Sequence, residues 1–378
     1  MSGPLRVGII GCGMAFQAIH LHALNSLATQ FRITAMCDAF ADVAQELAAR
    51  TGARAVANAD ELIAAPDVDV VLVATPDNLH HEHVIAACKA KKRAVLAEKP
   101  LALDTRLAAE MVKASETNGV PVIVAYPHVY DPMVTKALER WGKPDSFKYG
   151  EFRCVIGRNE EFLADCVQLI RTSKRVSFVG GMIGIFDLAI TTAQREGTDM
   201  EVMDIVAGGM MLGLTSHDIP VMRRFLGDPL KILYAGSRIM GILTDPATAE
   251  TSIGIDVILD YGLGRVNMQI EVQAMKMHDW HFMLRRDDLH LEVIYPSPFG
   301  GNTPAQLKVT TEQDGMTVEE IYSNKYESGY RGEWKHVYDV VVNGATPITS
   351  IQEAYKDLQL SEDIVHAIIT RTRQGGVQ

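Results

Sequence analysis

Cysteine is scarce in this chain, and its spacing shows no disulfide or metal-binding pattern. The number of cysteines is odd and no two have CxxC spacing, which argues against a disulfide framework and against a zinc ribbon. Because no secretory signal pattern opens the sequence either, this usage predicts a cytoplasmic protein. The five cysteines are Cys12, Cys37, Cys88, Cys154 and Cys166.

Long hydrophobic runs and an excess of basic charge are also missing. The apolar run Val7–Ile10 breaks at Gly11 and is far too short to cross a membrane. Lysine and arginine number 36 against 47 aspartates and glutamates, which gives a net charge of −11. An acidic chain without a basic block binds nucleic acids and anionic membranes poorly. We therefore expect no nucleic-acid partner and no membrane partner.

Apolar residues, in contrast, are plentiful enough for a large core. Of the 378 residues 47% are hydrophobic, which excludes a disordered chain. In the first third, short apolar strands alternate with helical patterns, which is typical of βαβ units and a parallel sheet. The predicted strands are Leu5–Ile10, Ile33–Cys37, Val68–Ala74, Ala94–Ala97 and Val120–Ala125, and the predicted helices are Met14–Ala28, Ala41–Arg50, His80–Ala90 and Leu103–Thr117.

The pattern changes after about Tyr126. Residues 159–227 have a mostly helical pattern, whereas residues 229–322 hold strands with little room for crossover helices. A capping box at 350–353 opens a last helix near 350–372, which we expect to pack back toward the first domain. The predicted fold class is α/β, with a dinucleotide-type domain at 1–126 and an α+β substrate-binding and oligomerisation domain with an open, mostly antiparallel sheet at 127–378. Its strand candidates are Ile253–Leu259, Arg265–Val272, Leu289–Ile294 and Gln306–Thr310.

The first predicted strand leads directly into a glycine turn and a helix. Gly11 permits the tight turn, and Gly13 lets the backbone approach a pyrophosphate. The helix that begins at Met14 and Ala15 would supply amide donors at its positive end. Phe16 occupies the third position of the usual GxGxxG/A pattern, which is a departure. Glycine also simply ends strands, but the strand before and the helix after this turn favour a dinucleotide site.

Asp38 ends the second predicted strand. A carboxylate there can accept hydrogen bonds from both hydroxyls of the adenosine ribose, and it would repel a 2′-phosphate. No lysine or arginine follows until Arg50. The residue therefore favours NAD over NADP as the cofactor, and the alternative is a solvated carboxylate in a turn.

Further segments carry a family resemblance. Ala74–His80 (ATPDNLH) and Ala97–Pro100 (AEKP) each follow a predicted strand, and Ser216–Ile219 (SHDI) precedes Arg224–Gly227 (RFLG) in the second domain. With the glycine turn, these segments resemble the glucose–fructose oxidoreductase/inositol dehydrogenase (Gfo/Idh/MocA) family, most closely over residues 5–132. The resemblance implies a Rossmann domain, and a C-terminal sheet that forms the interface of a homodimer or homotetramer. It also implies NAD(P)-dependent hydride transfer at a carbinol carbon.

The resemblance also assigns roles around the cofactor. It implies that Glu98 contacts the nicotinamide ribose, that Lys99 is catalytic, and that Pro100 follows a cis peptide bond. Ligands of open α/β sheets bind outside the carboxyl ends of the strands, where Glu98 and Lys99 stand. A lysine there can stabilise charge on the reacting oxygen, and the alternative is an ordinary surface lysine. The residues implied along the nicotinamide half of the cofactor are Thr75, Pro76, Asn78 and His80.

His217 is the implied general acid/base, since imidazole ordinarily titrates near neutrality. The family usually carries an aspartate four residues before this histidine, and this chain has Gly213 there. Asp218 does not replace it automatically, because neighbours along a helix do not face each other. Asp218 could instead hydrogen-bond the substrate. The alternative for His217 is a buried structural histidine.

Three weaker candidates for substrate contact remain. Tyr126 and His128 lie in a segment that a plain domain-crossing loop explains equally well. Asn159 lies in a polar and aromatic stretch that is also ordinary loop composition.

The histidine-rich segment 80–83 lacks a carboxylate or cysteine at a usual zinc spacing, so no metal site is predicted.

These features predict an NAD-dependent oxidoreductase that transfers a hydride between nicotinamide and a carbinol carbon of a sugar, cyclitol or related polyhydroxy compound. His217 would remove the hydroxyl proton while Lys99 stabilises the oxyanion. Two alternatives use the same cofactor. One is a glycosidase with a closed NAD redox cycle, and the other is a non-catalytic NAD-binding sensor, for which Gly213 would mark a decayed site.

Overall fold

The computed structural model divides the chain into two compact units. The first comprises Met1–Pro127, 168–188 and Tyr330–Gln359, and the second comprises His128–Val167, 189–329 and Leu360–Gln378. The last helix, α12 (Ile351–Arg373), contributes residues to both units. The residues that the structure describes are 3–143, 147–157, 168–172, 208–209, 211–240, 252–273, 278–297, 304–324 and 326–373.

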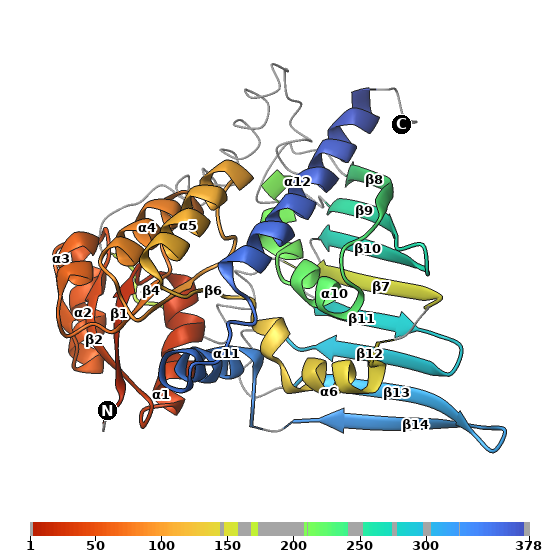
Figure 1. Cartoon of the computed structure of the whole chain (residues 1–378), viewed down its shortest axis with the longest axis horizontal. Helices are drawn as coiled ribbons and strands as arrows, with labels where there is room; N and C mark the ends of the chain where they lie inside the picture. The colour runs from red at the N-terminus through yellow and green to blue at the C-terminus, as the bar shows by residue number, and fades with distance from the viewer. Residues whose placement is uncertain are drawn as a thin grey trace. The chain divides into compact units, whose positions relative to one another are not determined.

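The first unit is built on a six-stranded parallel sheet with the order β3-β2-β1-β4-β5-β6 (Figure 1). This is the strand order of the Rossmann fold, and it confirms the predicted dinucleotide-type domain. The neighbouring strands pair in parallel throughout. The strands are β1 (Leu5–Ile10), β2 (Phe31–Cys37), β3 (Arg54–Ala55), β4 (Val70–Val73), β5 (Ala94–Ala97) and β6 (Val122–Val124).

Local signals begin and end the helices of this unit. The Asp104 side chain accepts a hydrogen bond from the Leu107 amide at 2.7 Å and caps helix α5 (Thr105–Asn118). Gly119 ends α5 in the left-handed conformation that glycine adopts without steric cost. The predicted helix Met14–Ala28 contains a π-helical turn, Phe16–His20, and ends earlier than expected. The α-helices are α1 (Leu21–Ser26), α2 (Ala41–Thr51), α3 (Ala59–Ala64), α4 (His80–Lys89), α5 (Thr105–Asn118) and α11 (Gly329–Tyr338).

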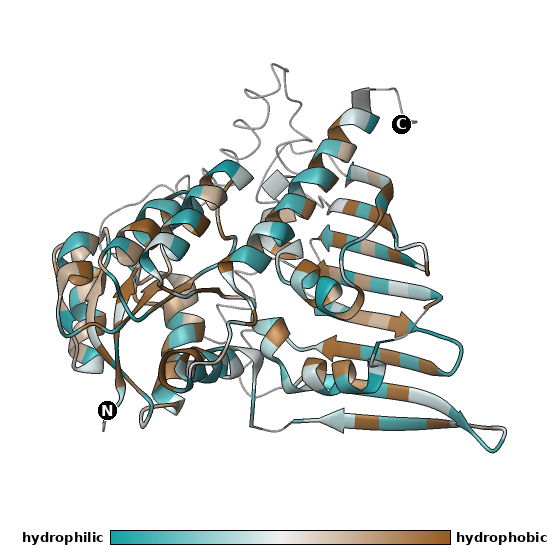
Figure 2. Cartoon of the chain, viewed as in Figure 1, coloured by the Kyte–Doolittle hydropathy of each residue, from teal (hydrophilic) through white to brown (hydrophobic). Residues whose placement is uncertain are grey.

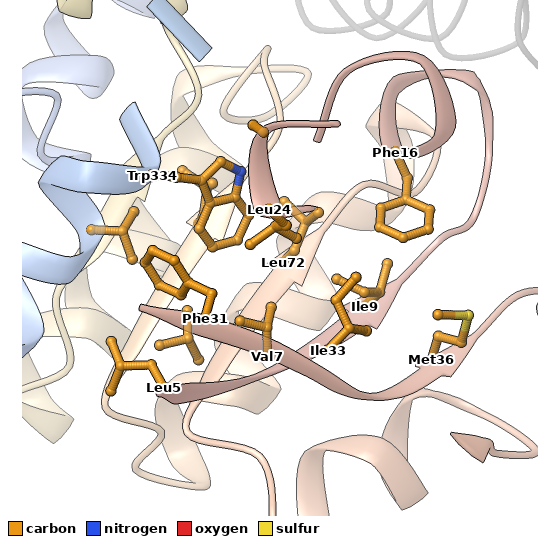
Figure 3. Packing of buried hydrophobic residues seen from close by; sticks show 14 of the residues in the cluster. Leu5, Val7, Ile9, Phe16, Leu24, Phe31, Ile33, Met36, Leu72 and Trp334 are labelled. Atoms are coloured by element: carbon orange, nitrogen blue, oxygen red, sulfur yellow. The ribbon is translucent and has the colours of Figure 1, made fainter. Parts of the chain in front are cut away.

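The core of this unit draws on both ends of the chain. On one face of the sheet, Val7 belongs to the same buried cluster as Phe31, Leu24 and Trp334 of α11 (Figure 3). The other face packs so tightly that a Cβ on Gly8 would lie 2.6 Å from the Leu62 side chain of α3. Because both faces are covered, the inner strands are continuously apolar, as buried parallel strands usually are.

The second unit contains an eight-stranded sheet with the order β14-β13-β12-β11-β7-β10-β9-β8. Only β7 and β10 pair in parallel among these neighbours, so the sheet is mostly antiparallel, as predicted. The strands are β7 (Tyr149–Ile156), β8 (Lys231–Met240), β9 (Ser252–Asp260), β10 (Arg265–Val272), β11 (His278–Arg285), β12 (Leu289–Tyr295), β13 (Gln306–Gln313) and β14 (Met316–Ser323).

The two faces of this second sheet differ in polarity. Figure 2 shows hydrophobic and hydrophilic positions alternating along its strands. The apolar face packs against helices α6 (Pro132–Trp141) and α10 (Asp218–Leu226), with Phe152 and Phe282 stacked on each other at 5.2 Å. The opposite face carries ion pairs that link neighbouring strands, such as Arg153 with Asp279 at 2.7 Å.

Two further expectations concern the helical pattern predicted over 159–227 and the absence of a membrane-spanning segment. Most of the helical pattern predicted over 159–227 lies outside the described residues, apart from a π-helical turn, Met211–Thr215, and α10. Across the portion of the chain that the structure describes, no helix is both long and apolar enough to span a membrane.

Candidate functional site

The glycine turn, Gly11–Gly13, follows β1 and has one crowded side and one open side. Gly11 has a φ of +91°, and a Cβ there would lie 2.3 Å from the carbonyl oxygen of Ala74. Only glycine fits this position without strain. A Cβ on Gly13 would meet no atom within 4 Å, and Met14 is 41% exposed. The backbone is therefore accessible where a pyrophosphate would approach a helix N-terminus, so this turn fits a dinucleotide.

Asp38 links the end of β2 to this turn. Its Oδ2 accepts a hydrogen bond from the Cys12 amide at 2.7 Å, and its Oδ1 accepts one from the Phe40 amide at 2.8 Å. A carboxylate offers about four lone-pair sites, so acceptor capacity remains for ribose hydroxyls. Both bonds hold the carboxylate at the carboxyl end of the sheet.

The loops after β4 and β5 lie beside the glycine turn. The Ala74 amide donates to the Ile10 carbonyl oxygen and the Glu98 amide donates to the Val73 carbonyl oxygen, both at 2.8 Å. Three strand ends thus meet, as the parallel register requires. The peptide bond between Lys99 and Pro100 is cis, which confirms the geometry that the resemblance implied.

The His80 side chain lies between the loop after β4 and the loop after β5 and contacts both. The side chain is fully buried, with Nε2 at 2.9 Å from the Thr75 carbonyl oxygen and Nδ1 at 2.8 Å from the Pro100 carbonyl oxygen. Backbone carbonyls only accept, so the ring nitrogen that carries the proton donates to one of these loops, and the imidazole lies between the two. Pro76 and Asn78 of the same loop are exposed.

Glu98 is held by hydrogen bonds to both carboxylate oxygens. Its Oε1 lies 2.8 Å from His20 Nε2, and its Oε2 accepts from the Lys99 amide at 3.1 Å. Burial raises the pKa of Glu98, but the hydrogen bond from His20 and the nearby Lys99 and His80 outweigh that effect. The net pKa lies below its usual value, so the carboxylate is ionised near neutral pH.

In the second unit, aromatic and histidine side chains form a cluster, which we call the His217 cluster: His128, His217, Trp280 and Tyr295. The rings of His128 and Tyr295 stack at 3.8 Å with an interplanar angle of 5°. The Trp280 ring stands edge-on to His128 at 4.8 Å and to His217 at 5.3 Å. Burial, with a contribution from His278, lowers the pKa of His128 to about 3, so this imidazole stays neutral.

Asp218 contacts the His217 cluster through Trp280. It is 2% exposed, and its Oδ1 accepts a hydrogen bond from Trp280 Nε1 at 2.8 Å. Burial raises the pKa of Asp218 to about 7, although the bond from Trp280 opposes that shift. Within the described residues, a Cβ on Gly213 would meet no atom within 4 Å, so space is available where the resemblance leads one to expect a carboxylate.

The structure thus groups the sequence-predicted residues in two places. Gly11, Gly13, Asp38 and Thr75 lie with Glu98 and Lys99 at the carboxyl end of the first sheet. His128, His217 and Asp218 lie together in the second unit, whereas Tyr126 is buried after β6 in the first. Asn159 lies outside the described residues.

Sequence reasoning missed two aromatic residues of these groups, Tyr295 and Trp334, and left open whether Trp280 lines the substrate side of the sheet or an oligomer contact. In the His217 cluster, Trp280 contacts His217 and Tyr295 stacks on His128. In the first unit, Trp334 donates a hydrogen bond to His20. The alternation of Trp280, Phe282 and Leu284 along β11 is the signal that would have placed Trp280 on the covered face. Among the residues described, no group of three or more histidine, cysteine or acidic side chains is arranged to hold a metal.

Comparison with known proteins gives a partial match in sequence. Residues 5–126 match the family described as "Oxidoreductase family, NAD-binding Rossmann fold" (GFO_IDH_MocA). Inositol 2-dehydrogenase 3 of Saccharopolyspora erythraea is 38% identical over 128 residues, which cover 34% of this chain and 37% of that protein. Myo-inositol 2-dehydrogenase of Thermotoga maritima is 27% identical over 238 residues, which cover 62% of this chain and 59% of that protein. The chain thus matches less than two thirds of the length of either relative.

Solved structures match over nearly the whole chain, and at this identity they show the fold alone. UDP-N-acetylglucosamine 3-dehydrogenase GnnA from Acidithiobacillus ferrooxidans has a TM-score of 0.68 at 16% identity, covering 96% of this chain and 97% of that one. KijD10, a 3-ketoreductase from Actinomadura kijaniata in complex with NADP, has a TM-score of 0.68 at 19% identity, covering 97% of each chain.

Proposed function

Because residues 5–126 match the Gfo/Idh/MocA oxidoreductase family, we propose that the chain is an NAD-dependent dehydrogenase of a sugar, cyclitol or related polyhydroxy compound. The observation that carries this proposal is the meeting of three strand ends, at which Gly11, Thr75 and Glu98–Lys99 converge. The inositol dehydrogenases among the relatives support the substrate class.

The glycine turn and the helix after it would bind the pyrophosphate, and Asp38 would bind the adenosine ribose. The pinned Asp38 carboxylate favours NAD, because a 2′-phosphate would meet a negative charge there. When bound, the nicotinamide supplies the hydride acceptor or donor.

Lys99 and His217 are the proposed catalytic residues. Lys99 donates a hydrogen bond to the reacting oxygen and stabilises the negative charge that develops on it. His217 accepts the hydroxyl proton in the oxidative direction and returns it in the reductive direction. Asp218 and His128 contribute to the substrate side of this chemistry through the His217 cluster. Tyr126 and Asn159 stay candidates for substrate contact, and Thr75, Pro76 and Asn78 for cofactor contact.

The test is NADH formation across inositols, aldoses, sugar acids and glycosides, with NADP run in parallel. We expect turnover on one polyol class with NAD, and a loss of kcat of about 100-fold or more in Lys99→Met and His217→Ala. The exposed residues Lys89 and His22 supply matched controls, and Lys89→Met and His22→Ala should keep wild-type rates.

Each departure from this result has a specific meaning. Full turnover in Lys99→Met or His217→Ala would disprove the catalytic assignment. Glycoside cleavage without net NADH would indicate a closed redox cycle, and NAD binding without any turnover would favour a sensor.

We also propose that the chain forms a homodimer or homotetramer through the polar face of the second sheet. Half-buried ion pairs across this face support this proposal; Arg153 pairs with Asp279 on the neighbouring strand, and Arg238 of β8 pairs with Glu271 of β10 across β9. Side chains of one copy that are already fixed by such pairs lose little freedom when a second copy covers them.

A further inference from the structure

A chain of buried hydrogen bonds connects α11 to the Glu98–Lys99 segment. Trp334 Nε1 donates to His20 Nδ1 at 3.1 Å, and His20 Nε2 lies 2.8 Å from Glu98 Oε1. Glu98 Oε2 accepts from the Lys99 amide at 3.1 Å. Trp334 and His20 are both fully buried, so water does not compete for these bonds.

Trp334 and the Glu98 carboxylate together determine the direction of the two bonds that His20 makes. An indole N–H can only donate, so His20 Nδ1 must be the acceptor and the imidazole proton must reside on Nε2. His20 Nε2 then donates to the Glu98 carboxylate. The tautomer of His20 is therefore fixed in part by a residue that lies more than 300 positions further along the sequence.

Trp334 itself is held by core packing. Its ring stands edge-on to Phe31 at 5.2 Å and to His20 at 5.9 Å. Leu24 and Leu72 belong to the same buried cluster (Figure 3). Because these neighbours fix the indole, they also fix the point from which the hydrogen-bond chain starts.

A second buried acid, Glu333, precedes Trp334 on α11. It is fully buried, and within the described structure neither of its carboxylate oxygens has a hydrogen-bond partner. Burial and the charge of Glu98 raise the pKa of Glu333 well above its usual value. Burial therefore favours the protonated form of Glu333, which adds no second negative charge beside Glu98.

We propose that Trp334 and His20 are positioning residues for the Glu98 carboxylate, through which α11 controls the affinity for the dinucleotide. The inference rests on the proposed function in one respect, which is that Glu98 contacts the nicotinamide ribose. A carboxylate pinned at both oxygens presents its remaining lone pairs in one direction, so the ribose hydroxyls meet a preformed acceptor.

The test begins with Trp334→Phe, which keeps an aromatic ring in the core and removes the N–H donor together with part of the buried indole volume. We expect NAD to bind about tenfold more weakly in calorimetric titration, because an oriented bond to a charged group is loosened. The KM for NAD should rise by a similar factor, while kcat at saturating NAD changes less than about twofold. A merely structural role would not produce this split between KM and kcat.

Ser115→Ala is the matched control. Its hydroxyl makes a buried hydrogen bond of 2.7 Å to the Val120 carbonyl oxygen in the same unit, with no link to Glu98. This variant should lower the melting temperature but leave NAD affinity unchanged. Equal weakening of NAD binding in both variants would overturn the proposal.

Nitrogen NMR of the histidine rings reads the tautomer directly and needs no turnover. The wild-type protein should show His20 protonated at Nε2 only, and Trp334→Phe should show loss of that single form. A wild-type His20 protonated at Nδ1 would refute the positioning role, even if the chain proves to be a dehydrogenase. Conversely, absence of turnover on every substrate would end the proposed function but leave the NMR and NAD-binding results as valid tests.

Discussion

Asp218 is a carboxyl group that folding keeps protonated at a pH where water would ionise it. Burial beside Trp280 raises its pKa to about 7, so between roughly pH 4 and 7 the folded chain binds a proton that the unfolded chain releases. Stability conferred by the protonated form is therefore complete at low pH and is lost as the pH rises toward 7.

We expect Asp218→Asn to flatten this dependence. The amide oxygen can still accept from Trp280 Nε1, but nothing titrates. Unfolding free energies measured from pH 4.5 to 8 should show the wild type losing stability relative to the variant as the pH rises toward 7, by up to about 1.4 kcal/mol per pH unit. Comparing the two proteins removes the contributions that they share, such as those of Asp131, whose pKa burial raises to about 6, and of His128, whose lowered pKa acts in the opposite direction. Parallel curves for the two proteins would contradict the assignment to Asp218.

At the scale of single residues, the sequence predicts those whose role follows from local spacing. The glycine turn and the strand-end positions of Thr75, Glu98 and Lys99 belong to this class, because parallel strands bring their carboxyl ends together. The bond from Trp334 to His20 and the bond from Trp280 to Asp218 join distant segments. One sequence contains no signal for such pairs, so the environments of Glu98 and His217 required the structure.

At the scale of elements, helix α11 completes the core of the first unit. Trp334 and Val337 are fully buried in the cluster that contains Val7, Leu24 and Phe31. Truncating a buried tryptophan costs about 3–5 kcal/mol, which is a large share of the stability of an ordinary domain.

We expect a fragment of residues 1–127 to lack a cooperative melting transition and to bind a hydrophobic dye. The same fragment joined through a flexible linker to residues 330–359 should melt cooperatively and release the dye. Circular dichroism and dye fluorescence measure both properties. A fragment of residues 1–127 that melts as sharply as the joined form would show that α11 is dispensable for this core.

Elements were predicted well where burial gives a strong pattern. The predicted strands Leu5–Ile10, Ala94–Ala97 and Arg265–Val272 coincide with β1, β5 and β10. Strand β14 was not predicted, because it lies at the edge of the sheet and its sequence, MTVEEIYS, shows no clear apolar alternation. Edge strands are exposed on one side, so pairing with β13 rather than apolar burial defines this strand.

At the scale of the whole molecule, the proposed self-association depends on the polar face of the second sheet. Arg153 bonds Asp279 and Gln269 from its place on the central strand β7. We expect light scattering of the wild type to give a multiple of 41.5 kDa. Arg153→Glu should shift that mass toward 41.5 kDa, because it sets like charges beside Asp279.

Arg106→Glu, an exposed site on α5 of the first unit, is the control and should leave the mass unchanged. A wild-type protein of monomer mass at micromolar concentration would disprove self-association. An oligomer unaffected by Arg153→Glu would place the contact on another surface.

The division of the first unit between distant stretches of the chain determines when it can be completed during protein synthesis. A ribosome produces the six strands of the first sheet early, but Trp334 emerges only after the entire second sheet has been translated. Until then Phe31 and Leu24 lack their aromatic neighbour, and His20 has no donor to select its tautomer. Nascent chains that stall before this point would carry the glycine turn yet hold the dinucleotide poorly. Tight cofactor capture therefore marks a chain that has been translated through α11.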